Sequence, residues 1–170
     1  MKYGKVLWSL GLVFTLVPAG ILLGAPAQAI ESKELSQVDS AISDLNTCLA
    51  SFSEPVLDVF FLMDGSGSLA NDGTRPGADP EGIRFEAVEQ SIAPLAELAG
   101  GDVKVNIAAG TFGDQADTVF PWTQVTVRDA SDISQEISLE LKESFNKENT
   151  NWVAGLELAE QELATKRAEG

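Results

Sequence analysis

Three oxygen-bearing side chains alternate with glycine directly after an apolar run. Residues 56–68 read Val-Leu-Asp-Val-Phe-Phe-Leu-Met-Asp-Gly-Ser-Gly-Ser, which places one carboxylate and two hydroxyls at Asp64, Ser66 and Ser68. The glycines between them let the backbone turn sharply and approach a ligand closely. Oxygen ligands suit Mg²⁺, Mn²⁺ or Ca²⁺ rather than zinc or copper, and the chain has no histidine to supply an imidazole.

The apolar run must position these side chains. Val56 to Met63 is broken only by Asp58 and has the length and the β-branched and aromatic content of a strand buried on both faces. Ligands of open α/β sheets gather outside the carboxyl ends of the strands, which is where Asp64 begins the polar turn. We therefore predict a divalent-cation site at the end of a buried strand.

A family resemblance rests on these residues. Leu57–Met63 followed by Asp64–Ser68 resembles the first strand and the Asp-x-Ser-x-Ser motif of von Willebrand factor A domains, which opens their metal-ion-dependent adhesion site. Asn149-Thr150-Asn151, followed by Ala154-Gly155-Leu156, is similar to the family's second metal-site segment, usually Gly-Gly-Thr-Asn before a helix of small residues. The resemblance makes Thr150 the third hydroxyl ligand. It also implies a doubly wound, Rossmann-like α/β fold with strand order 3-2-1-4-5-6.

Four other motifs share features with this turn. Asp64-Gly65 is also a hairpin signal, but a polar, glycine-rich stretch follows instead of a second strand. An EF-hand loop is excluded because the positions that need Gly and Glu are Leu69 and Arg75. A haloacid-dehalogenase-type phosphotransferase needs its second Asp at Ser66, and a phosphate-binding P-loop needs a Lys. For the second segment, the alternative is that Thr150 or Asn151 only caps a helix.

The first 29 residues have the pattern of a signal peptide. Lys2 and Lys5 precede the mostly apolar stretch Val6 to Leu23, and Ala27-Gln28-Ala29 is a small-x-small cleavage site. We expect a secreted or extracytoplasmic protein that is cleaved after Ala29. The alternative is an uncleaved membrane anchor, because the stretch approaches the roughly 18–20 residues that span a bilayer.

Charge and cysteine content restrict the partners. The chain has 26 acidic and 11 basic residues and a formal net charge of −15. Such a surface repels phosphate backbones and concentrates divalent cations, so we expect no nucleic-acid partner. The single cysteine, Cys48, can form no internal disulfide; it either pairs with a cysteine outside the chain or is buried.

Apolar spacing predicts the remaining elements. Residues 30–54 form an amphipathic helical segment with apolar residues at spacings of 3 and 4: Leu35, Val38, Ile42, Leu45, Leu49 and Phe52. In residues 55–170 the pattern predicts a helix from Asp79 to Ala99, strands at 103–112 and 118–127 joined by a tight antiparallel turn, a helix capped by Ser131-Asp132, and a last helix from Trp152.

The resemblance covers Pro55 to Gly170, which contains only three strands. The family's fourth strand ends in an Asp that completes the metal site, and no such strand follows Glu169-Gly170. The strand order leaves the first strand at an edge, although Val56–Met63 is too apolar for an exposed edge. We therefore expect an amino-terminal fragment of a von Willebrand factor A domain, truncated after three strands, that binds metal weakly by itself.

The resemblance implies an adhesion module. Asp64, Ser66, Ser68 and Thr150 would hold Mg²⁺, or Mn²⁺ or Ca²⁺, and a carboxylate of a protein ligand would complete the ion's coordination. Membrane association would come only through an anchor outside this chain. Nothing in the residues argues for catalysis, because there is no histidine and no serine with a visible base. The alternatives are an accessory domain of a larger exported enzyme or chelatase-like assembly, and an inert structural domain.

Overall fold

The chain divides into a unit of residues 14–55 and a unit that contains residues 56–170. The computed structural model describes residues 43–45, 47–69, 77–79, 81–144 and 149–169. In the first unit, residues 43–45 and 47–49 are helical, as the apolar spacing predicts. The predicted signal peptide and the start of the helical segment lie outside the described residues. Cys48 is exposed, so burial of this thiol is wrong.

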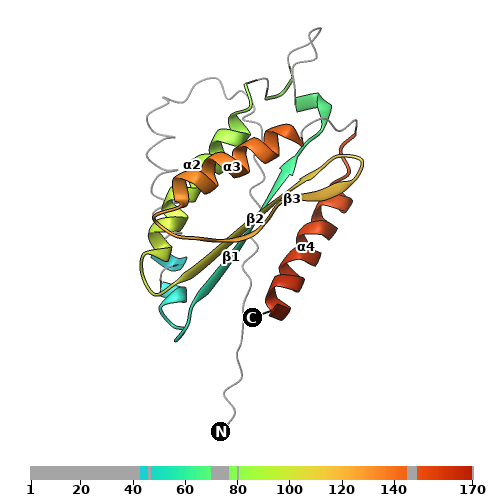
Figure 1. Ribbon diagram of the computed structural model, residues 1–170. Coiled ribbons are helices and arrows are strands. Elements are labelled where there is room, and N and C mark those ends of the chain that lie inside the picture. The colour runs from blue at the N-terminus through green and yellow to red at the C-terminus, as the bar shows by residue number, and fades with distance from the viewer. Residues whose placement is uncertain (1–42, 46, 70–76, 80, 145–148, 170) are drawn as a thin grey trace, which may run out of the picture. The chain divides into compact units, whose positions relative to one another are not determined.

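The second unit contains a three-stranded mixed sheet. Strands β1 (Val56–Asp64), β2 (Lys104–Phe112) and β3 (Ala116–Val125) lie in the order β1-β2-β3 (Figure 1). β1 and β2 are parallel, and β2 and β3 are antiparallel. The predicted hairpin and the predicted edge position of the first strand are both confirmed.

Helices cover both faces of this sheet. α2 (Ile83–Ala99) and α3 (Ala130–Glu143) lie on one face, and α4 (Trp152–Glu169) lies on the other (Figure 1). A short 3₁₀ helix, η1 (Gly67–Leu69), follows β1. The layers are those of the predicted Rossmann-like α/β fold. Along the described residues, no helix combines the length and apolar content needed to cross a membrane.

The start of α2 differs from the prediction. The helix begins at Ile83 and not at Asp79, because Gly82 takes a left-handed conformation with φ of 73° immediately before it. Its end at Gly100 is as predicted, and Pro94 lies inside the helix without ending it.

The start of α3 differs as well. Its N-cap is Asp129 and not Ser131. The Asp129 carboxylate accepts the Thr126 N–H at 2.6 Å, and the Thr126 carbonyl accepts the Ala130 N–H at 3.1 Å. This compact turn ends β3 at Val125, two residues before the predicted end, and starts α3 at once.

The core has its centre on β2. Fully buried side chains come from β2, from the end of β3 and from the two helices on the first face: Val105, Ile107, Ala108, Ala109, Val125, Ile92, Ile137 and Leu141. On the second face, Phe60 and Ala108 pack with Ala159 of α4. Each buried Ile or Leu contributes about 1.5–3 kcal/mol relative to an exposed one. The middle strand is therefore held from both sides.

β1 is less buried than predicted. Val59, Phe61 and Leu62 are only half-buried, so the expectation of a strand buried on both faces is wrong for the described residues. The reason is that β1 pairs only with β2 within the described part of the chain. The side chains along its other edge lack a neighbouring strand to cover them.

Two glycines let α4 approach the sheet closely. A Cβ at Gly155 would lie 2.8 Å from the ring of Phe112. A Cβ at Gly110 would lie 2.9 Å from both Leu158 and Phe60. Because real Cβ atoms do not come so close, both positions require glycine for this packing.

Glu162 also ties α4 to β3. Its carboxylate accepts hydrogen bonds from the Thr118 hydroxyl at 2.5 Å and the Trp122 indole N–H at 3.0 Å. Glycine contacts hold the first turns of the helix against the sheet, and Glu162 holds its second half. The segment that leads into α4 is therefore anchored at a defined place.

We expect Gly155→Val to lower the free energy of unfolding by about 2 kcal/mol, because the added methyl groups would overlap the buried Phe112 ring. The matched control is Ala164→Val on the exposed side of the same helix, which should cost only about 0.5 kcal/mol through helix propensity. Urea unfolding followed by circular dichroism measures both. Equal losses for the two variants would show that the close contact does not hold α4.

Candidate functional site

The motif turn starts where β1 and β2 end level with each other. Asp64, the last residue of β1, is in register with Phe112, the last residue of β2. The Gly65 N–H donates to the Phe112 carbonyl at 2.8 Å, and the Leu69 N–H donates to the Ser66 carbonyl at 3.2 Å. The chain therefore turns into η1 beyond the sheet edge, and the hairpin interpretation of this turn is wrong.

The three predicted ligands on the turn lie together. Asp64 Oδ1 accepts the Ser66 N–H at 2.8 Å, and the hydroxyl oxygens of Ser66 and Ser68 are 3.2 Å apart. Ser66 is 1 % exposed, whereas Ser68 is exposed. Each hydroxyl carries two lone pairs, and only one of the two can donate to the other. The pair therefore still offers oxygen lone pairs to a cation.

Thr150, the fourth predicted ligand, is anchored to the same end of the sheet. The Asn151 N–H donates to the Gly113 carbonyl at 2.8 Å, and Gly113 follows directly on β2. Asn151 also accepts the Ala154 N–H at 3.2 Å, which confirms it as a cap of α4. Thr150 is exposed, and among the described residues no hydrogen bond joins it to the motif turn. The structure thus places it at the shared edge without a hydrogen bond to the motif turn among the described residues.

Sequence reasoning missed two residues that hold this segment. The Asn149 side-chain amide donates a hydrogen bond to the Asp114 carboxylate in the turn between β2 and β3. Asn149 stands where von Willebrand factor A domains commonly have glycine, so the resemblance gave it no role. The signal that could have found the pair is chemical: Asp and Asn in adjacent turns readily bond to neighbouring polar groups.

The available ligands decide which ions fit. The described residues contain no group of three or more His, Cys, Asp or Glu side chains that could hold a metal. A cation at this edge would instead be held by hydroxyls with the single Asp64 carboxylate. These oxygen donors fit Mg²⁺, Mn²⁺ or Ca²⁺ and do not fit a soft metal.

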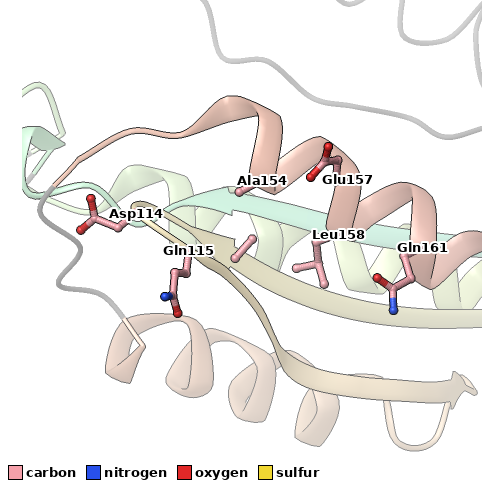
Figure 2. Close-up of a pocket in the computed structure, with 7 residues that line it drawn as sticks. Asp114, Gln115, Ala154, Glu157, Leu158 and Gln161 are labelled. Carbon is pink, nitrogen blue, oxygen red and sulfur yellow. The ribbon is translucent and has the colours of Figure 1, made fainter.

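A shallow groove lies beside the Thr150 segment. It runs between the β2–β3 turn and the first turns of α4 and is lined by Asp114, Gln115, Ala116, Ala154, Glu157, Leu158 and Gln161 (Figure 2). None of the predicted ligands lines it. The groove is therefore distinct from the motif turn.

Asp79 is a titratable group with a shifted pKa near the start of α2. Burial raises the pKa of Asp79, but the N–H groups of Arg84 and Ile83 and the Arg84 guanidinium lower it by more. The net pKa lies below its ordinary value of 3.8. The carboxylate is therefore ionised and paired at neutral pH.

Comparison with known families decides the classification. The sequence profile of the von Willebrand factor type A domain matches residues 58–170, well over half of the chain. The chain belongs to the von Willebrand factor type A domain family. The match includes both the motif turn and the Thr150 segment of this A domain.

Solved structures that resemble this chain are distant in sequence. The vWF domain of the type V pili tip protein Mfa5 from Porphyromonas gingivalis is 15 % identical, with a TM-score of 0.50 over 67 % of this chain and 34 % of that one. An uncharacterized membrane spanning protein from Vibrio fischeri is 19 % identical, with a TM-score of 0.40 over 66 % of this chain and 51 % of that one. The A domain thus spans about a third to a half of these proteins. Among curated proteins, no relative matches significantly.

We expect the stability contributed by Asp79 to depend on pH. Because its folded pKa lies below the unfolded value of 3.8, the contribution is complete above that value and is lost as the pH falls through the folded pKa. Asp79→Asn should therefore reduce the free energy of unfolding more at pH 6 than at pH 3. Glu86→Gln, an exposed change of equal charge in the first turn of α2, is the control. Urea unfolding at both pH values measures the difference; an identical loss at both would contradict it.

Proposed function

We propose that this A domain is a binding module that captures an acidic group of a partner protein through a divalent cation. The observation that supports the proposal most is the 3.2 Å separation of the Ser66 and Ser68 hydroxyl oxygens beside Asp64 at the end of β1. Thr150 supports it because its neighbour Asn151 is hydrogen-bonded to the same sheet edge. Membership of the von Willebrand factor A family, whose domains commonly serve in adhesion or protein interaction, supports the proposal further.

Asp64, Ser66, Ser68 and Thr150 would hold the ion, for which Mg²⁺ is the first choice and Mn²⁺ or Ca²⁺ the alternatives. Burial of Ser66 fixes one hydroxyl before any ion arrives, so its ordering costs little on binding. Only one of the four residues is charged. The bound ion would therefore keep much of its positive charge. It would also keep an open coordination position for a carboxylate oxygen of the partner.

Because the protein is strongly acidic, we expect the binding of an acidic partner to depend on the cation. The protein carries a formal net charge of −15, and Asp64 lies within the motif turn itself. A partner carboxylate would be repelled by both unless the local charge were reversed. We infer that the partner is recognised only when the cation is present.

A location outside the cell fits this role. The predicted signal peptide supports export, and the match to a domain of a pilus tip protein supports an envelope-associated or secreted setting. We propose binding and not catalysis as its role, since the chain offers no histidine and no serine with a visible base.

We expect Mg²⁺ to stabilise the protein against heat, because an ion that binds only the folded state adds on the order of 2.7 kcal/mol when it is about 100-fold above its dissociation constant. Asp64→Ala should remove most of the rise in melting temperature. Differential scanning calorimetry in matched ionic strength, with NaCl in place of MgCl₂, measures the effect.

The matched control is Asp102→Ala, which removes one exposed carboxylate from the turn before β2. Because Mg²⁺ also binds weakly to any acidic surface, this variant should keep the wild-type response. If wild-type protein and Asp64→Ala respond equally to Mg²⁺, the turn binds no ion, and the domain is a structural one.

A further inference from the structure

Residues 77–79 return to the end of the motif turn. The Ala78 N–H donates to the Ser68 carbonyl at 3.1 Å, and the Asp79 N–H donates to the Leu69 carbonyl at 3.0 Å. Two successive backbone bonds therefore attach the returning chain to Ser68, which carries the second hydroxyl, and to Leu69 directly after it.

Asp79 is held in turn by the start of α2. Its Oδ1 accepts the Ile83 N–H at 2.8 Å, and its Oδ2 accepts the Arg84 N–H at 3.2 Å and the Arg84 guanidinium at 2.5 Å. The carboxylate is thus bound by three donors of one helix end. A charge-assisted bond of this kind is stronger than a neutral one.

The ion pair is largely removed from solvent. The side chains of Arg84 and Asp79 are 8 % and 16 % exposed. The guanidinium carbon lies 4.3 Å from the centre of the Phe85 ring, which packs beneath it. Water screens such a pair little, so its geometry is better defined than that of a surface ion pair.

The two hydroxyl ligands predicted on the motif turn depend on different supports. Ser66 is 1 % exposed and is fixed by the packing around it. Ser68 is exposed, so packing does not fix it. Its position depends on the backbone of η1, and the bonds from Ala78 and Asp79 join that backbone to the helix packed on the sheet.

We propose that Asp79 and Arg84 form a clasp that positions Ser68 for cation binding. The clasp connects α2 to the motif turn: the helix holds the Asp79 carboxylate, and the Asp79 backbone with Ala78 holds the carbonyls of Ser68 and Leu69. This inference rests on the proposed function, since the site that it serves is the cation site. Both residues act through the turn and do not touch the ion.

Two variants separate the clasp from an ordinary helix cap. Asp79→Asn keeps an oxygen that can accept the Ile83 N–H but removes the charge that binds Arg84. Arg84→Met keeps the Asp79 cap and an apolar stem over Phe85 but removes the guanidinium. The controls are Glu86→Gln and Arg128→Met, both at exposed positions. They change the net charge by the same amounts as Asp79→Asn and Arg84→Met, respectively.

The experiment measures Mg²⁺ affinity by isothermal titration calorimetry, and amide hydrogen exchange at Ala78 and Asp79 without metal, on the purified protein and each variant. We expect Asp79→Asn and Arg84→Met to weaken Mg²⁺ binding about tenfold and to speed exchange at both amides. Both controls should stay within about twofold of wild type. If Arg84→Met does not fold, Asp79→Asn alone decides the result.

The outcomes distinguish the two proposals. If wild-type protein binds Mg²⁺ and Asp79→Asn binds it equally well, the clasp does not position the site, while the proposed function stands. If wild-type protein binds no Mg²⁺, the proposed function fails and the clasp fails with it. A lower melting temperature with unchanged affinity would reduce the pair to a structural role and overturn the inference.

Discussion

The arrangement at the candidate site depends on two strands that end level. Parallel pairing in register brings Asp64 beside Phe112, and the carbonyls of Phe112 and of Gly113 directly after it then anchor two separate segments. The Phe112 carbonyl binds Gly65 of the motif turn, and the Gly113 carbonyl binds Asn151 of the segment that carries Thr150. Backbone bonds to adjacent residues therefore bring segments more than eighty positions apart in the sequence to one edge of the sheet.

The bond from Asn151 to the Gly113 carbonyl depends on close packing of α4 against the sheet. Glycines at 110 and 155 remove the side chains that would otherwise keep the helix away from β2, and Glu162 fixes its far half on β3. Glycine inside a helix costs about 1 kcal/mol relative to alanine. That cost is consistent with a need for close approach, since nothing else in the helix requires Gly155.

Much of this arrangement could be predicted from the sequence, because local patterns determine it. The apolar run Val56–Met63, the tight turn after Phe112 and the motif turn each contain their own signal, and strand order and fold class followed from the family resemblance. Helix starts were less predictable, since Gly82 and Asp129 act through backbone conformation and turn contacts. The degree of burial of β1 was overestimated, because composition does not show how many strands lie alongside.

The sequence does not show which polar side chains bond to each other. The residue types mark Asn149 and Asp114 as turn residues that readily bond to polar neighbours, but only the fold shows that they bond to each other. The pairing of Asp79 with Arg84 likewise appears only in the fold, because loop carboxylates are usually solvated. Ligand roles for Asp64, Ser66, Ser68 and Thr150 stay predictions, as does a fourth strand beside β1. What the structure adds is that the Asp64 carboxylate accepts the Ser66 N–H and that the Ser66 and Ser68 hydroxyls are hydrogen-bonded to each other. It also adds that Thr150 is tethered to the same sheet edge through the backbone of Asn151.

The central claim is that a divalent cation binds at this edge and not elsewhere on the acidic surface. Anomalous diffraction from crystals of the protein grown with Mn²⁺ tests it most directly, because the anomalous signal locates the ion independently of any assumed site. The account predicts one strong peak within coordination distance of the Ser66 and Ser68 hydroxyl oxygens. Peaks only at scattered surface carboxylates, with none at these hydroxyls, would contradict it.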